Sequence, residues 1–81
     1  MAELTNSLKD KRNARGLTQE ALAERVGVTR QTIISIERAK FVPSVKLALA
    51  LAAALGISIH ELFWLEDPND RINPRSGPLE K

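Results

Sequence analysis

The sequence has no cysteine and few aromatic residues: two phenylalanines, one tryptophan and no tyrosine among 81 residues. Without cysteine, the chain has no disulfide scaffold, no thiolate metal site and no cysteine nucleophile. Three aromatic side chains are too few for an aromatic-rich β core or for the stacking platforms that bind single-stranded nucleic acids. Disulfide-rich domains, thiolate metal domains and stacking-type nucleic-acid binders are therefore excluded.

Long apolar runs are also missing. The longest, Leu47–Leu55, has nine residues, whereas a membrane-spanning helix needs about 20. The first residues show no basic region followed by an apolar stretch, so we expect no secretory signal. With 43% hydrophobic and 27% charged residues, the composition is typical of a globular domain. We expect no contact with a membrane and a cytoplasmic location, at the nucleoid if the chain binds DNA.

The net charge is only +2, but it is unevenly distributed. Residues 9–40 contain eight basic and four acidic side chains, which gives +4, while the segments before and after them are each −1. A basic segment of this kind indicates an anionic partner on one side of the molecule. Charge alone is equally consistent with a solvated surface of mixed sign. The choice between an anionic partner and a solvated surface therefore depends on the sequence motifs.

Helix start and stop signals divide the chain into five short helices and a tail. Thr18, Thr29 and Ser44 are suitable N-caps, Ser58 begins a capping box with Glu61, and glycines follow several of the expected helix ends. The predicted helices span residues 5–15, 18–27, 29–39, 43–55 and 58–65. No segment alternates like a strand. The predicted fold class is all-α, with one domain over residues 1–66 and a flexible tail over residues 67–81.

The second and third predicted helices carry the most informative spacing. Counted from Gln19, a small residue stands at the fifth place (Ala23) and a glycine at the ninth (Gly27). A small side chain lets two steeply crossing helices approach each other, and glycine tolerates the positive φ of a tight turn. Five further positions close a small apolar core under the pair: Leu22, Val26, Val28, Ile33 and Ile36. All seven positions of a helix-turn-helix are met.

On these residues the sequence resembles the lambda-repressor-like helix-turn-helix domains, also called the xenobiotic-response-element (XRE) family. The resemblance covers residues 4–65, is strongest over residues 16–33, and is supported by residues 36–44 and 54–64. The chain is similar above all to small bacterial and archaeal regulators that carry only this domain. The resemblance implies a five-helix fold in which the third helix enters the major groove and two copies bind a symmetric operator.

The third predicted helix has a polar face opposite its core residues, Ile33 and Ile36. Glutamine can pair with adenine, arginine with guanine or phosphate, and an aliphatic group can contact a thymine methyl. A solvated face without a function is the alternative. We predict that five residues of this face read bases: Arg30, Gln31, Ile34, Ser35 and Arg38.

Other residues are assigned to the DNA backbone. Gln19 matches the family's backbone-clamping glutamine, at a helix N-terminus whose amides can approach a phosphate. Thr29 can serve both as an N-cap and as a phosphate donor. Arg15, Lys40 and Lys46 are assigned to the backbone as well, although a solvated surface position explains them equally well.

Arg12 and Glu37 are given a structural role. In the family, residues at the matching positions form an ion pair that ties the first and third helices together, and loss of one partner of a buried pair typically costs about 3–5 kcal/mol.

Two positions depart from the family pattern. Ile34 replaces the polar residue of many relatives on the reading face, and Ala39 stands where a glycine usually follows the recognition helix.

A homodimer is expected from the fourth and fifth predicted helices. Residues 45–55 are apolar apart from Lys46, and neighbouring helices in so small a domain can cover only part of such a helix. Residues at the end of the fifth helix should leave further apolar surface open. Alternatively, small alanines leave little area uncovered and the tryptophan packs under the tail. The predicted interface contains Leu49, Trp64 and Leu65.

Catalysis and metal binding find little support. His60 is the only histidine, and no nucleophile, carboxylate pair or phosphate loop has the surroundings that catalysis needs. We expect no enzyme activity, no metal and no cofactor.

The leading hypothesis is a sequence-specific transcriptional regulator, most simply a repressor, that binds double-stranded DNA as a homodimer. An antitoxin-type module that also binds DNA, and engages a second protein through the tail from Asp67, is the alternative; a scaffold with a degenerate motif is a third possibility.

Overall fold

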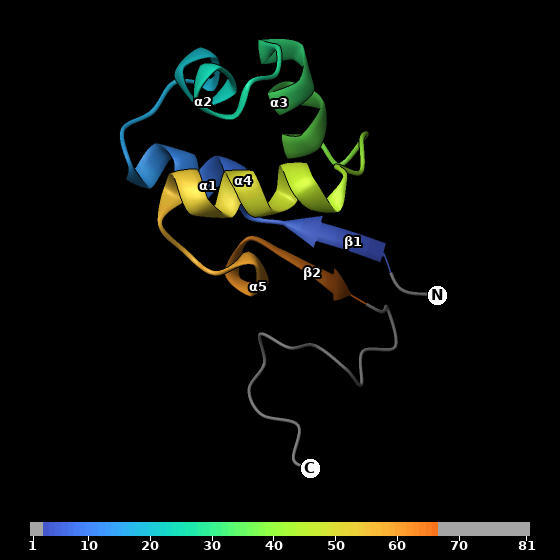
Figure 1. The fold of residues 1–81 in the computed structure, drawn as a ribbon. Helices are drawn as coiled ribbons and strands as arrows, with labels where there is room; N and C mark the ends of the chain where they lie inside the picture. Colours follow the sequence, from blue (N-terminus) through green and yellow to red (C-terminus); the bar gives the residue numbers. More distant parts are fainter. Residues whose placement is uncertain (1–2, 67–81) are drawn as a thin grey trace.

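The computed structural model describes residues 3–66 as five short helices with a short strand at each end (Figure 1). In chain order, the elements are β1 (Glu3–Asn6), α1 (Leu8–Ala14), α2 (Gln19–Val26), α3 (Arg30–Glu37), α4 (Val45–Leu55), α5 (Ile59–Leu62) and β2 (Phe63–Glu66). The five expected helices are present, together with a sheet that was not expected. The tail predicted over residues 67–81 lies outside the described residues.

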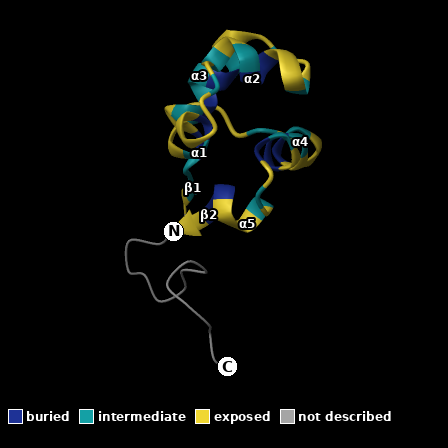
Figure 2. Ribbon diagram, turned by 90° about the vertical axis from the view of Figure 1, so that its left-hand side faces the viewer, coloured by how far each residue is buried: buried dark blue, intermediate teal, exposed yellow. Residues whose placement is uncertain are grey.

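Helices α1 and α4 lie in the middle of the molecule, with the α2–α3 pair on one side and the strands and α5 on the other (Figures 1 and 2). The core between these layers takes aliphatic side chains from all five helices. The largest fully buried ones are Leu8, Leu22, Ile33, Ile36, Leu51 and Leu62. Each such side chain stabilises the fold by roughly 1.5–3 kcal/mol. Ala23 is also buried, as expected for the small residue between two crossing helices.

Three predicted N-caps are confirmed. The side chains of Thr18, Thr29 and Ser44 each accept a hydrogen bond from a backbone N–H three residues later, at 2.9, 3.3 and 3.0 Å. Each cap gives a hydrogen-bond partner to an N–H group of the first helical turn, which is typically worth about 1 kcal/mol. Local side-chain chemistry therefore sets the starts of α2, α3 and α4.

The end of α3 keeps a left-handed turn without glycine. Three other helix ends use a glycine with φ between 69° and 78°, whereas Ala39 takes a φ of 60°. Its N–H donates to the carbonyl of Ile36, and the N–H of Lys40 donates to that of Ser35, both at 2.9 Å. These two bonds form a Schellman motif. The turn is therefore retained with a Cβ in an unfavourable region, at a cost on the order of 1 kcal/mol.

The predicted five-helix fold is confirmed, but all-α is only approximate, because a two-stranded sheet joins the two ends of the domain. Strands β1 and β2 pair as an antiparallel sheet, with Leu4 opposite Leu65 and Thr5 opposite Trp64. Each strand has four residues, and the two are separated in sequence by the entire helical domain. Strands this short show too little alternation to be recognised, and no hairpin turn joins them.

The sheet also changes the first and fifth helices from their predicted ranges. α1 begins at Leu8 instead of Thr5, and α5 has four residues because Phe63 is already extended, with φ −132° and ψ 138°. The predicted capping box is absent as well. Ser58 is the N-cap of α5, but its side chain accepts no capping hydrogen bond.

Two polar residues at the end of β1, Asn6 and the following Ser7, attach the sheet to the helices. Asn6 donates from Nδ2 to the carbonyl oxygen of Ile36 at 2.9 Å, and its Oδ1 accepts from the N–H of Leu8 at 3.0 Å. The hydroxyl of Ser7 donates to the carbonyl oxygen of Glu61 at 2.8 Å. The start of α1 is thereby bonded to the end of α3 and to α5, which holds α3 in a fixed position.

Candidate nucleic-acid interface

Helix α3 buries one face and opens the other to solvent. Ile33 and Ile36 lie in the core with 0% and 1% of their surface exposed. The five residues predicted to read bases keep surface open: Arg30, Gln31 and Arg38 are exposed, and Ile34 and Ser35 are half-buried. The face predicted from the helix periodicity is therefore accessible to a ligand.

One hollow beside this face, which we name the α2-side hollow, has a volume of about 300 Å³ and lies between α3 and the first turns of α1 and α2. It is lined by Lys9, Gln19, Arg30, Ile34, Glu37 and Arg38. Three of these side chains are cationic, and only 4% of the surface of the Glu37 side chain is exposed. Exposed cations over a buried carboxylate favour an anionic group such as a phosphate.

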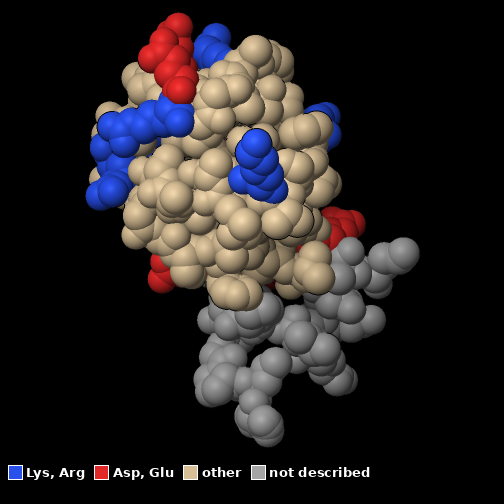
Figure 3. Space-filling view, viewed as in Figure 1, with Lys and Arg blue, Asp and Glu red and all other residues tan. Residues whose placement is uncertain are grey.

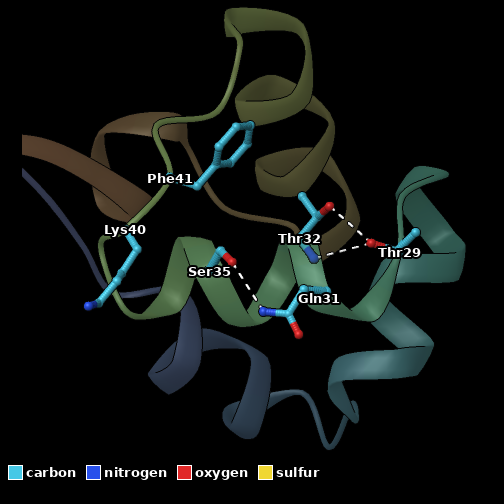
Figure 4. Close-up of a pocket in the computed structure, with 6 residues that line it drawn as sticks. All are labelled: Thr29, Gln31, Thr32, Ser35, Lys40 and Phe41. Carbon is cyan, nitrogen blue, oxygen red and sulfur yellow. Dashed lines mark hydrogen bonds between the residues drawn. The ribbon is translucent and has the colours of Figure 1, made fainter.

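A second hollow, the loop-side hollow, has a volume of about 260 Å³ and lies between α3 and the loop that follows it (Figure 4). It is lined by Thr29, Gln31, Thr32, Ser35, Lys40 and Phe41. Gln31 Nε2 donates to Ser35 Oγ at 3.3 Å, and the hydroxyl oxygens of Thr29 and Thr32 are 3.1 Å apart. Amide and hydroxyl groups therefore form one wall, and the loop supplies an ammonium and an aromatic ring.

Three lining residues were missed by the sequence interpretation: Lys9, Thr32 and Phe41. Lys9 belongs to α1 and reaches the hollow only because α1 packs beside α3, so no local pattern could have identified it. Phe41 is 47% exposed. An aromatic residue directly after the basic end of the predicted recognition helix was the one available signal.

Beneath the α2-side hollow lies a buried polar network around Glu37. Arg12 donates to its carboxylate from Nε at 2.6 Å and from Nη2 at 3.3 Å, and donates from Nη1 to the carbonyl oxygen of Leu17 at 2.8 Å. Gln19 Nε2 adds a third bond to Glu37, at 3.2 Å. Arg12 is 7% exposed. The network joins α1, the start of α2 and the end of α3.

Gln19 therefore has a partner inside the protein as well as a place in the α2-side hollow. One N–H of its amide is bound to Glu37, which leaves a second N–H and the amide oxygen for other partners. Thr29 likewise combines its cap with a position in the loop-side hollow. Both assignments to the DNA backbone stay predictions, with side chains held in place for them.

Two other predicted backbone residues lie outside both hollows. Arg15 lines a smaller hollow of about 190 Å³ with Leu17 and Arg25. Its guanidinium lies over the C-terminal end of α4, so close that a Cβ at Gly56 would be 2.9 Å from Nη2. A cation there is stabilised by the helix dipole. Lys46 is exposed in the first turn of α4 and lines neither hollow.

The cations of the interface have no ion-pair partner in the described part of the chain. The only ion pair within residues 3–66 joins Arg12 and Glu37, so Arg30, Arg38 and Lys40 remain available to an external anion. In the same range, no three metal-ligating side chains gather into a site. No described helix combines the length and apolarity that crossing a membrane requires.

Comparison with known proteins agrees with this geometry. A family model described as helix-turn-helix matches residues 8–62, more than half of the chain. The chain belongs to the lambda-repressor-like, XRE-type helix-turn-helix family. It is a transcriptional regulator with a helix-turn-helix DNA-binding domain, in which α2 and α3 form the motif.

Relatives and solved structures extend this comparison. The HTH-type transcriptional regulator YgzD of Bacillus subtilis is 44% identical over 66 residues, which are 82% of this chain and 100% of that protein. The HTH-type transcriptional regulator MJ0272 of Methanocaldococcus jannaschii is 48% identical over 64 residues, 79% of this chain and 97% of that protein.

Among solved structures, the restriction-modification controller protein C.AhdI from Aeromonas hydrophila is 39% identical, with a TM-score of 0.64 over 67% of this chain and 82% of its own. SinR, the master regulator for biofilm formation, was solved in complex with DNA; it is 33% identical, with a TM-score of 0.61 over 65% of this chain and 86% of its own.

The residues predicted for a dimer interface differ in exposure. Leu49 on α4 is 51% exposed and Leu65 on β2 is 55% exposed, whereas Trp64 is 9% exposed. The expectation of open surface at Trp64 is wrong: this residue lies in β2 and is buried, as is Phe63 before it. Val45, one turn before Leu49, is 73% exposed. Val45 and Leu49 form an apolar stripe, the α4 stripe. The side of the molecule on which α4 lies in Figure 1 carries few charged side chains (Figure 3).

Proposed function

We propose that this protein is a sequence-specific transcriptional regulator that binds a palindromic operator in double-stranded DNA as a homodimer, most simply as a repressor. The observation that carries the proposal is the accessible face of α3 with a hollow on each side. The hollows are lined by cationic, amide and hydroxyl groups, which are the groups that contact phosphates and base edges.

The geometry supports entry of α3 into the major groove. An α-helix fits a groove about 12 Å wide, and the hollows on both flanks of α3 give room for the sugar-phosphate backbones that border the groove. The α2-side hollow supplies Lys9 and Gln19 to one strand, and the loop-side hollow supplies Lys40 and two threonine hydroxyls to the other. The residues that then meet the base edges are Arg30, Gln31, Ile34, Ser35 and Arg38.

Two copies double this interface. In a two-fold dimer the recognition helices meet successive faces of the major groove, about 34 Å apart, so each half-site is read once. The α4 stripe and Leu65 offer exposed apolar surface for the dimer contact. A dimer seated on an operator represses transcription by occupying the DNA. The protein works where the chromosome lies, which agrees with the cytoplasmic location expected from the sequence.

Selection from a library of random duplexes tests the proposal directly. The full chain is immobilised, bound duplexes are amplified over successive rounds, and the enriched sequences are compared. We expect a palindromic consensus whose half-sites are centred one helical turn apart. Enrichment of unrelated sequences, or of none, would contradict sequence-specific binding.

The salt dependence of binding gives an independent measure. A dimer that neutralises roughly 6–10 phosphates should lose about 10³–10⁵ in affinity between 50 and 200 mM salt, because the DNA releases its condensed counterions. Fluorescence anisotropy with the selected duplex measures this slope. A flat response would indicate a partner other than duplex DNA.

A further inference from the structure

Ile34 is an aliphatic residue on a face of α3 that the fold does not need to be apolar. Its side chain is half-buried in the α2-side hollow. The apolar side chains that form the core or pack against it come from every helix, and on α3 these are Ile33 and Ile36. Ile34 therefore gives no support to the core, and its side chain is placed to contact a ligand.

The side chains beside Ile34 indicate which chemical groups the ligand must carry. Arg30 and Arg38 lie four residues before and after it, so the three side chains follow one another along one side of the helix. Both arginines are exposed, and neither guanidinium has a hydrogen-bond or ion-pair partner within residues 3–66. We name these three residues the Arg–Ile–Arg stripe. Gln31 and Ser35 face the loop-side hollow instead.

The floor of the major groove offers one apolar group larger than a C–H edge, the C5 methyl of thymine. The other groups that distinguish the base pairs there are hydrogen-bond donors and acceptors. An isoleucine placed against a donor or acceptor would remove its water without replacing the hydrogen bond, which is unfavourable. Cytosine methylated at C5 presents the same methyl at the same place. Arginine pairs with guanine through O6 and N7.

We propose that Ile34 reads the C5 methyl group of a pyrimidine in each half-site, beside guanine read by at least one arginine of the Arg–Ile–Arg stripe. The inference rests on the proposed function and adds the chemical class of base to it. Affinity for the operator then depends on the methyl group itself, so methylation of cytosine at this position strengthens binding as thymine does.

Removal of single methyl groups from the selected duplex tests this inference. Each thymine of the half-site is replaced in turn by deoxyuridine, which lacks only the C5 methyl, in both half-sites together. At one position we expect the full-length protein to lose affinity about fourfold per half-site. This factor corresponds to the free energy of burying one methyl or methylene group. Ile34→Ala should bind the thymine and uracil duplexes equally, and Ile34→Val should lie between.

A matched variant separates the methyl contact from a general loss of binding. Val42→Ala shortens another exposed aliphatic side chain, 69% exposed, that lines neither hollow, and it should keep the full uracil penalty. Thermal melting should show Ile34→Ala folded, because Ile34 is not a core residue and alanine favours helix.

A second pair of duplexes identifies the source of the methyl. The sensitive pair is replaced by cytosine–guanine and by 5-methylcytosine–guanine. Tighter binding of the methylated duplex, lost in Ile34→Ala, makes both bases ligands. Equal binding of the two contradicts the expected effect of cytosine methylation; with the uracil penalty retained, it restricts the methyl contact to thymine.

Two results would overturn the inference and differ in what they leave standing. If selection returns a consensus but no uracil replacement affects the parent protein more than Ile34→Ala, the methyl contact is wrong and the proposed function stands. If no duplex is selected, the proposed function fails and the inference fails with it.

Discussion

At the scale of single residues, Glu37 links the stability of the fold to the candidate interface. Its carboxylate receives two bonds from Arg12 and one from Gln19, while its side chain lines the α2-side hollow. The negative charge is thereby neutralised directly beneath the place proposed for DNA. A free carboxylate there would repel a phosphate, so the ion pair serves packing and electrostatics together.

Removal of one partner from this pair should be costly. We expect Glu37→Gln or Arg12→Met to lower the free energy of unfolding by about 3–5 kcal/mol, because a buried charge or donor set loses its counterpart. Urea denaturation measures this cost. The double variant Arg12→Met/Glu37→Leu should lose less than the sum of the single changes. A cost below about 1 kcal/mol for each single variant would mark the pair as equivalent to an exposed one.

Gln31 and Gln19 should differ in how they affect DNA binding, although both carry the same side chain. Gln31→Ala should cost about 1–3 kcal/mol and relax the preference at one position per half-site, because the amide reads a base edge. Gln19→Ala should weaken all duplexes by a similar factor, because phosphates carry no sequence information. Competition with single-base variants of the selected duplex compares the two. An unchanged specificity profile for Gln31→Ala would falsify its assignment to base reading.

At the scale of elements, α3 ends in the left-handed turn that usually requires glycine, although the residue there is Ala39. The Schellman bonds that follow α3 are formed although Ala39 has a φ of 60°. The turn directs the chain into the loop that carries Lys40 and Phe41, one wall of the loop-side hollow. Alanine in place of the family's glycine therefore still forms the left-handed turn, and its cost is strain in the backbone of Ala39.

Ala39→Gly should relieve that strain. We expect an increase in stability on the order of 1 kcal/mol, because glycine adopts positive φ without steric cost. For a domain of this size, this corresponds to a rise of about 4–8 °C in the melting temperature. The reverse change at the end of α2 is the control: Gly27 has a φ of 78° and no atom within 4 Å of an added Cβ. Gly27→Ala should therefore lower the melting temperature through backbone strain alone. A lower melting temperature for Ala39→Gly would contradict this account.

The two strands show the opposite case, in which an element forms without a local signal. β1 and β2 hold together residues 3–6 and 63–66, and Asn6 and Ser7 then bond the sheet to α3 and α5. Two four-residue strands are not stable alone in water. Their stability comes from Phe63, which is 8% exposed and belongs to the hydrophobic core of the domain, and from the bonds of Asn6 and Ser7.

At the scale of the whole molecule, exposed apolar surface on α4 predicts self-association. Light scattering at micromolar concentration without DNA should give the mass of a dimer, and Leu49→Glu should reduce it to a monomer by placing a charge in the α4 stripe. Leu65→Glu determines whether β2 contributes. Val42→Glu introduces the same charge at a residue outside α4 and should leave the dimer intact. A monomer mass for the parent chain would leave dimerisation to the operator.

Trp64 is no longer expected to contribute to the dimer interface. It was expected in the dimer interface, but its burial makes it part of the monomer fold. Trp64→Ala should therefore act on the stability of the chain before it acts on association. The exposed neighbour on the same strand, Leu65, keeps its place in the proposed interface.

The sequence by itself determined the features that depend on neighbouring residues. Caps at Thr18, Thr29 and Ser44, the turn at Gly27, and the exposed side of α3 all follow from contacts within about one helical turn, which are written in the local pattern. For the same reason, the accessible face of α3 could be identified before the structure, from the positions of Ile33 and Ile36; its role in base reading stays a prediction.

Tertiary structure alone decided the features that join distant parts of the chain. The sheet pairs the two ends of the domain, Lys9 reaches the α2-side hollow from another helix, and Trp64, opposite Thr5 in the sheet, is buried. Arg15 lies against Gly56 at the end of α4, outside both hollows beside α3. Such contacts depend on how packed elements meet in space, and no spacing along the chain encodes them.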